Sequence, residues 1–160
     1  MVGNLYHPQK ERRMEQLKQI SIFSENKPGR LKKITKVLAE EGVNILAINI
    51  ASSNGFGVLK FIVDNHELAH QKLQQKGFTV SLNEVLAIEL VDKPGGLFEV
   101  ATILSKKRIN IENAYVLILE SRKKAYLIVD VNDIEKAKKL LKHEKLRFFT
   151  AKKIVKRKNA

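Results

Sequence analysis

Apolar and polar residues follow the same order in two halves of this chain. Residues 17–25 read LKQISIFSE and residues 84–91 read EVLAIELV, and this β-rich alternation predicts a strand in each half. A Pro-Gly pair follows each segment, and apolar residues at helical spacing come next, which predicts a helix. The apolar stripes of these two helices are Leu31, Ile34, Val37 and Leu38 in the first half, and Leu97, Val100, Ala101 and Leu104 in the second.

Two further strands and a short helix are predicted after each of these helices. In the first half, NILAINIASS and FGVLKFIVD flank Asn54-Gly55, a dipeptide typical of two-residue β-hairpins. In the second half, IENAYVLILE and AYLIVDV are joined by the basic turn SRKK. Helical spacing of apolar residues returns at 68–73 and at 134–141, and the segments FTVSL and RFFT each close one half as a strand.

The two halves match in one ungapped alignment. An offset of 66 residues pairs Pro28 with Pro94 and Asn44 with Asn110. The order strand, helix, strand, strand, helix, strand therefore occurs twice, and this is the order of a ferredoxin-like unit. We predict an α+β fold of two ferredoxin-like βαββαβ units, with antiparallel sheets and with helices on one face.

The repeat divides the chain into four segments. We expect an N-terminal extension at residues 1–16, a first unit at 17–83, a second unit at 84–150 and a basic C-terminal tail at 151–160. Several strands, such as ILAINIA and AYVLIL, are apolar on both faces, as in sheets that are covered on both sides. The face without helices is therefore expected to meet the other unit or another copy of the chain.

Composition and charge narrow the possible functions. No apolar run approaches the roughly 20 residues that span a bilayer. The chain contains no cysteine, which excludes disulfides and thiolate chemistry, and a cytoplasmic protein is the default expectation. The net charge is +13, and residues 151–160 contribute five basic and no acidic residues. Such a tail either keeps the chain soluble or attracts nucleic acid or an acidic protein partner, so a basic adaptor is the alternative function.

The run SENKPGRLKKITKVLAEEGVNI in the first half resembles the ACT domain, a small regulatory module of amino-acid metabolism. The run DKPGGLFEVATILSKKRINI in the second half resembles it more loosely. The whole chain is similar to stand-alone tandem ACT proteins that are described as amino-acid-binding. This resemblance implies a homodimeric, non-enzymatic regulator that binds a small effector, often an amino acid, at interfaces between ACT units.

Residues of the ligand site also follow from the resemblance. In a serine-sensing ACT domain, the polar residue two places before the proline and the asparagine that opens the second strand contact the ligand. That sensor also has a histidine four residues before its proline, where this chain has Ser24 and Leu90, so the resemblance does not extend to serine as the ligand. The matching candidates are Asn26 and Asn44 in the first unit, and Asp92 and Asn110 in the second.

The residues themselves support a ligand at the two Pro-Gly turns. A helix that begins at Pro28 or Pro94 would offer unpaired N–H groups and a positive dipole end to a carboxylate, and glycine lets a ligand approach the backbone. The alternative is that Asn26 and Asp92 merely cap the two helices. The candidate ligand-binding residues are Asn26, Pro28, Gly29, Arg30, Leu31, Asn44, Asp92, Gly95, Gly96, Leu97 and Asn110.

One motif points to different chemistry and is set aside. HELAH at residues 66–70 matches the histidine spacing of zinc proteases, but a catalytic zinc needs a third ligand, and the second half has IEKAK at the corresponding helix. No catalytic constellation stands out, and the two repeats occupy nearly the whole chain. We therefore expect no metal, no cofactor and no enzymatic activity.

Overall fold

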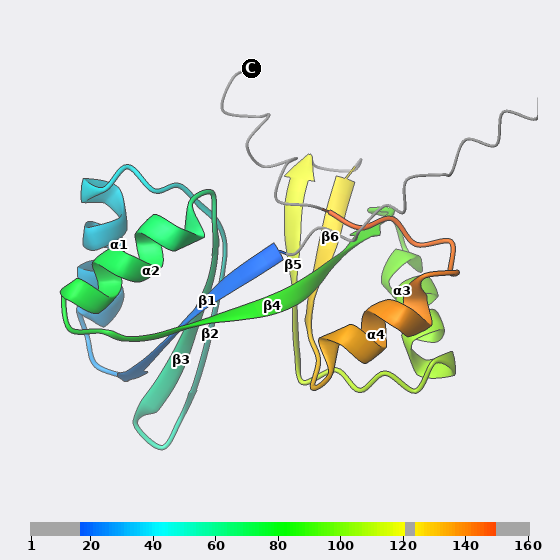
Figure 1. Cartoon of the computed structure of the whole chain (residues 1–160), viewed down its shortest axis with the longest axis horizontal. Coiled ribbons are helices and arrows are strands. Elements are labelled where there is room, and N and C mark those ends of the chain that lie inside the picture. The colour runs from blue at the N-terminus through cyan, green and yellow to red at the C-terminus, as the bar shows by residue number, and fades with distance from the viewer. Residues whose placement is uncertain (1–16, 121–123, 150–160) are drawn as a thin grey trace, which may run out of the picture.

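The computed structural model of the chain describes residues 17–120 and 124–149 (Figure 1). Its elements follow the predicted order in both halves, so the α+β prediction is confirmed. They are β1 (Leu17–Glu25), α1 (Arg30–Glu40), β2 (Ile45–Ser53), β3 (Phe56–Val63), α2 (His66–Gln75), β4 (Thr79–Leu90), α3 (Gly96–Lys106), β5 (Asn113–Glu120), β6 (Lys124–Asp130) and α4 (Ile134–Leu141). The predicted extension at residues 1–16 and the tail at 151–160 lie outside the described residues.

The six strands of the described residues form one antiparallel sheet in the order β2-β3-β1-β4-β6-β5. Strand β4 joins the two halves, because residues 79–85 pair with β1 and residues 86–90 pair with β6. The predicted unit boundary between residues 83 and 84 falls within this strand. The second half closes with a short bridge between Phe148 and Ile88 rather than with a full strand.

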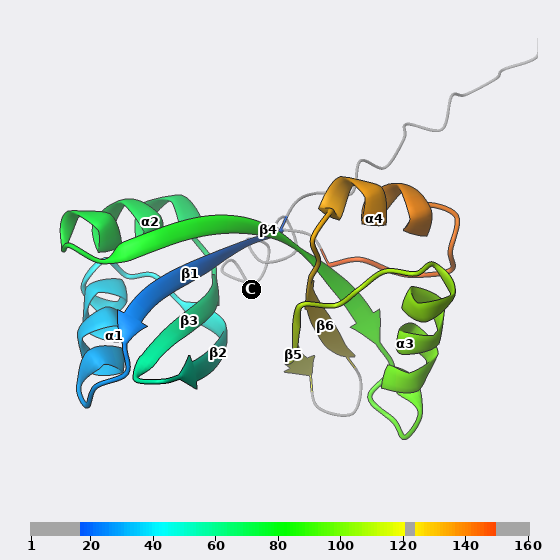
Figure 2. The same cartoon turned by 90° about the horizontal axis from the view of Figure 1, so that it is seen from below.

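The helices lie on the outside and the two halves of the sheet face each other. Helices α1 and α2 cover one half-sheet, and α3 and α4 cover the other (Figures 1 and 2). Each half has its own core between helices and sheet. A third apolar cluster joins the inner faces of the halves, so the expectation that the helix-free faces meet is confirmed. It contains Leu17, Ile62, Val85, Ala87, Leu117, Tyr126, Ile128 and Phe149.

The two Pro-Gly pairs form the same turn in both halves. Gly29 has φ 82° and ψ −8°, and the amide of Arg30 donates to the carbonyl of Lys27 at 3.2 Å. These values describe a type II turn with proline and glycine in its two central positions. Helix α1 therefore begins at Arg30 and α3 at Gly96. The prediction that Pro28 and Pro94 start these helices is wrong because each proline sets the turn before its helix.

Both long helices also end alike. Gly42 has φ 66°, and the amide of Val43 donates to the carbonyl of Leu38 at 2.9 Å, so glycine ends α1 as predicted. Arg108 takes the same position after α3 and has φ 53° in spite of its side chain. The repeat thus extends to backbone conformation, even where the residue type has changed.

Candidate functional site

A pocket of about 490 Å³ lies at the start of helix α1. The turn between β1 and α1 forms one wall, and strands β2 and β3 form the floor. Its lining residues are Ser24, Glu25, Asn26, Lys27, Pro28, Gly29, Arg30, Leu31, Ile50, Gly57 and Leu59.

The floor of the pocket is set by strand register. Ile50 of β2 pairs with Leu59 of β3, and Ser24 of β1 pairs with Gly57 of β3. Leu59 is buried in the core of the first half, whereas Ile50 is half exposed. Because side chains alternate along a strand, Ser24 continues the helix-facing row that begins with Ile20 and Ile22 in the same core. The floor is therefore apolar with one hydroxyl at its end.

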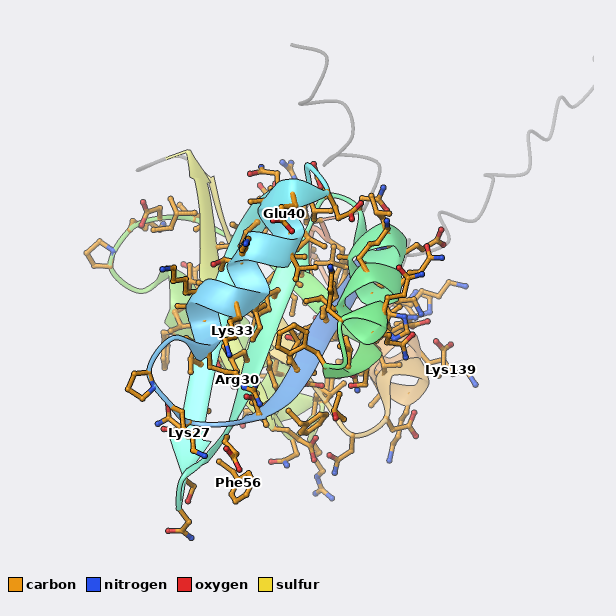
Figure 3. All side chains as sticks on the ribbon, turned by 90° about the vertical axis from the view of Figure 1, so that its left-hand side faces the viewer. Lys27, Arg30, Lys33, Glu40, Phe56 and Lys139 are labelled. Atoms are coloured by element: carbon orange, nitrogen blue, oxygen red, sulfur yellow. The ribbon has the colours of Figure 1, made fainter. Side chains whose placement is uncertain are left out.

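The guanidinium group of Arg30 lies beside the Ser24 hydroxyl. The Arg30 side chain donates from Nε to Ser24 Oγ, and the Ser24 hydroxyl donates to the carbonyl of Glu25 at 3.1 Å. The Arg30 guanidinium carbon also lies 5.8 Å from the ring centroid of Phe78, within the range of a cation–π contact. Figure 3 shows Arg30 and Lys27 at the same end of α1, next to the hairpin that carries Phe56. Arg30 is thus held in place by its neighbours before any ligand binds.

The start of α1 adds to the positive field of the pocket. Its N-cap is Gly29, and no side chain caps the helix. The first N–H groups of a helix lack intrahelical partners, and they favour an anion. On the rim, Lys27 Nζ lies 2.5 Å from Glu25 Oε2, and a hydrogen bond and the charge of Lys27 lower the pKa of Glu25.

The prediction that Asn26 caps α1 is wrong. The Asn26 side chain makes no cap, and its backbone N–H donates to the carbonyl of Gly55.

The structure brings together five of the six residues predicted in the first half, namely Asn26, Pro28, Gly29, Arg30 and Leu31. Asn44 does not line the pocket. Its amide donates to the Asp64 carboxylate at 3.0 Å, and its carbonyl accepts from the Asp64 amide at 3.1 Å. It therefore fixes the start of β2, beyond the opposite end of α1.

The corresponding turn in the second half is built differently. Its backbone repeats the type II turn, with Gly95 at φ 88° and the Gly96 amide donating to Lys93. Gly96 is buried, and a Cβ atom there would lie 2.0 Å from the carbonyl oxygen of Val91. Close backbone packing accounts for this glycine without a ligand.

The 66-residue offset that aligns the two halves shows which side chains differ between the two turns. Leu90 and Gly96 stand where the first half has the hydrogen-bonded pair of Ser24 and Arg30. The other predicted residues of the second half are all exposed, and these are Asp92, Gly95, Leu97 and Asn110. The N-cap of α3 is Gly95, so Asp92 does not occupy the N-cap position.

The pocket lies next to an edge of the sheet. Strand β2 is an edge strand, and its side chains Ile48 and Ile50 are 43% and 49% exposed. Both pair with core residues of β3, so they lie on the helix side of the sheet. The contact between the halves uses the opposite side, so no element of the described residues pairs with the outer edge of β2.

In the part of the chain that the structure describes, no three His, Asp or Glu side chains are grouped closely enough to hold a metal ion. His66 lies in the first turn of α2, and burial lowers its pKa. Among the same residues, no helix has the length and apolar character to cross a membrane.

Comparison with known proteins finds a family match and solved structures with a similar fold. The family described as an ACT domain pair matches residues 15–157. A crystal structure of protein BT0572 from Bacteroides thetaiotaomicron is 33% identical and covers 88% of this chain and 96% of its own, with a TM-score of 0.79. The ligand-free regulatory subunit of aspartate kinase from Thermus thermophilus is 19% identical over 81% of this chain and 92% of its own, with a TM-score of 0.59.

A search of curated proteins gives no match. The family match, however, spans both halves and nearly the whole sequence, and the solved structures have the same fold. The resemblance inferred from the two Pro-Gly segments is thereby confirmed. The chain belongs to the family of ACT domain pairs.

Proposed function

We propose that this protein is a non-enzymatic regulator that binds an amino acid in the pocket of its first half. One observation carries the proposal: Arg30 and the uncapped start of α1 flank an apolar floor within a pocket of about 490 Å³. This volume is in the range of small-molecule sites. The match to the ACT family supports a regulatory role.

The chemistry of the lining residues suggests how an amino acid binds. Its carboxylate is placed next to Arg30 and the first N–H groups of α1, where charge-assisted hydrogen bonds are available. The ammonium group is placed near the Asn26 side chain and the Glu25 carboxylate, which supply acceptors. The side chain rests on Ile50 and Leu59, so an aliphatic amino acid suits the floor better than a polar one.

A second copy of the chain is part of this proposal. An edge strand offers unpaired backbone groups, and the exposed Ile48 and Ile50 add apolar surface next to the pocket. A homodimer formed along β2 would cover the opening and place the ligand between ACT units, as the resemblance implies. Asn44 stays a candidate contact from the second copy. An effector can shift such an assembly only through different affinities for its two arrangements.

A thermal-shift screen of the full chain against the twenty amino acids tests the proposal. At a concentration of 100 times Kd, a ligand that binds only the folded state stabilises it by about 2.7 kcal/mol. For a chain of this size, that free energy raises Tm by roughly 5–10 °C. We expect at least one aliphatic amino acid to give such a shift, with its D-enantiomer as the matched control.

Two outcomes would count against the proposal. If no amino acid shifts the Tm of the folded protein, amino acids are not its effectors. If L- and D-enantiomers give equal shifts, the binding lacks the stereochemical fit that a pocket with fixed donors and a fixed floor requires.

A further inference from the structure

A buried polar cluster crosses the contact between the two halves. Lys60 Nζ of β3 lies 2.8 Å from Asp130 Oδ2 of β6, and each of these side chains is only 17% exposed. Gln19 of β1 is fully buried and donates from Nε2 to Asp130 Oδ2 at 3.3 Å. The hydroxyl of Tyr115 on β5 donates to Gln19 Oε1 at 2.8 Å. The cluster therefore links two strands of each half.

Burial affects the protonation of Tyr115 in this cluster. Desolvation, with a smaller contribution from the charge of Asp130, raises the pKa of Tyr115 above its usual range. The phenol therefore stays protonated and remains a donor to Gln19. If one hydrogen bond of the cluster breaks, the polar groups that formed it remain buried without a partner. The cluster therefore resists losing its contacts one at a time.

Strands β2 and β3 carry the pocket floor on the face opposite the contact between the halves. Leu59 and Lys60 are neighbours on β3, and Ile50 and Asn49 are neighbours on β2. Side chains alternate along a strand, so Ile50 and Leu59 face the pocket while Asn49 and Lys60 face the second half. A shift of β2 or β3 on one face therefore moves side chains on the other.

The contact between the halves also has unmet hydrogen bonds. Asn49 Oδ1 and Asn113 Nδ2 are buried and have no hydrogen-bond partner among residues 17–120 and 124–149. Asn49 pairs across the strands with Lys60, and Asn113 pairs with Asp130, so the two unmet groups flank the ion pair on either side. A buried polar group without a partner is costly, so the hydrogen bonding around the ion pair is incomplete in this arrangement of the halves.

We propose that occupancy of the first-half pocket is transmitted to the second half through β2 and β3, with the cluster of Gln19, Lys60, Tyr115 and Asp130 as the coupling element. This inference rests on the proposed function, because it concerns the same pocket. It adds the direction of the signal, from the pocket floor through the sheet to β5 and β6.

The test uses a probe that does not depend on the effector. The chain has no cysteine, so Leu31→Cys creates a single thiol in the pocket lining that N-ethylmaleimide can modify. Hydrogen exchange then measures how well the backbone amides of β5 and β6 are protected. We expect the adduct at position 31 to change their exchange rates by about 5-fold or more, as for a coupling in the usual allosteric range.

Matched variants separate coupling from general destabilisation. Lys36→Cys places the same adduct on the same helix outside the pocket lining, on a side chain that is 71% exposed, and should leave β5 and β6 unchanged. In the Lys60→Met and Asp130→Leu background, the effect of the pocket adduct should vanish. Tyr115→Phe, which removes only one hydrogen bond, should reduce it.

Three results would overturn the inference. The exchange changes could be confined to the first half, they could be equal for the adducts at positions 31 and 36, or they could persist without the ion pair. A failed amino-acid screen with a positive adduct experiment would overturn the proposed ligand and leave the coupling intact, so the two ideas fail separately.

Discussion

Replacing Asp130 with alanine is expected to lower the free energy of unfolding by about 3 kcal/mol. The substitution leaves the Lys60 ammonium largely buried without its partner and removes one of the acceptors of Gln19. The cost of breaking a buried ion pair comes mainly from the charge that remains, and the partial exposure of this pair places it at the lower end of the usual range. Urea unfolding followed by circular dichroism measures the change.

Two variants control this result. Lys60→Met combined with Asp130→Leu removes both charges and should cost about 1 kcal/mol or less, because apolar replacements of a buried pair are often neutral. Glu135→Ala removes a carboxylate that is 66% exposed from an ion pair with Lys138, and it should change stability by less than about 0.5 kcal/mol. An Asp130→Ala variant as stable as the wild type would show that the cluster does not hold the halves together.

Gly96→Ala is expected to lower the free energy of unfolding by about 3 kcal/mol, as in overpacked sites. The new Cβ would lie 2.0 Å from the Val91 carbonyl oxygen, which is backbone and has little freedom to move away. For a chain of this length the loss corresponds to a fall in Tm of roughly 6–12 °C, which differential scanning calorimetry measures.

Gly95→Ala is the matched control for this turn. Gly95 has φ 88° and nothing within 4 Å of its Cβ position, so alanine there meets conformational strain but no clash. Its cost should be about 1–2 kcal/mol, which is smaller than that of Gly96→Ala. The reverse order of the two effects would contradict the packing described for the second turn.

The repeat and the order of elements could be predicted because both depend on local patterns. Period-2 and helical spacing identify each strand and helix, and Asn54-Gly55 identifies the hairpin. The continuity of β4 was harder to predict, because Asn83-Glu84 looks like a polar junction. Neither residue breaks a strand, however, and pairing with β1 and then with β6 carries the strand through.

The candidate site was predictable only where it is contiguous in sequence. Asn26 and Arg30 belong to the turn that the Pro-Gly pair marks, whereas Ile50 and Leu59 reach the pocket through strand register. Ser24 carried a usable signal, because it is the polar end of the helix-facing row of β1. In the second turn, the Val91 carbonyl oxygen occupies the space beside Gly96. No sequence pattern predicts that position of the backbone.

Isothermal titration of the full chain with the amino acid that gives the largest thermal shift tests the central claim most directly. The account predicts one site per chain. Arg30→Met should weaken binding by about 10- to 100-fold, since hydrogen bonds to charged groups contribute about 1.5–3 kcal/mol. Lys33→Met removes the same charge from α1 outside the pocket lining and should bind like the wild type. Unchanged affinity in Arg30→Met, or equal losses in both variants, would contradict a site at the start of α1.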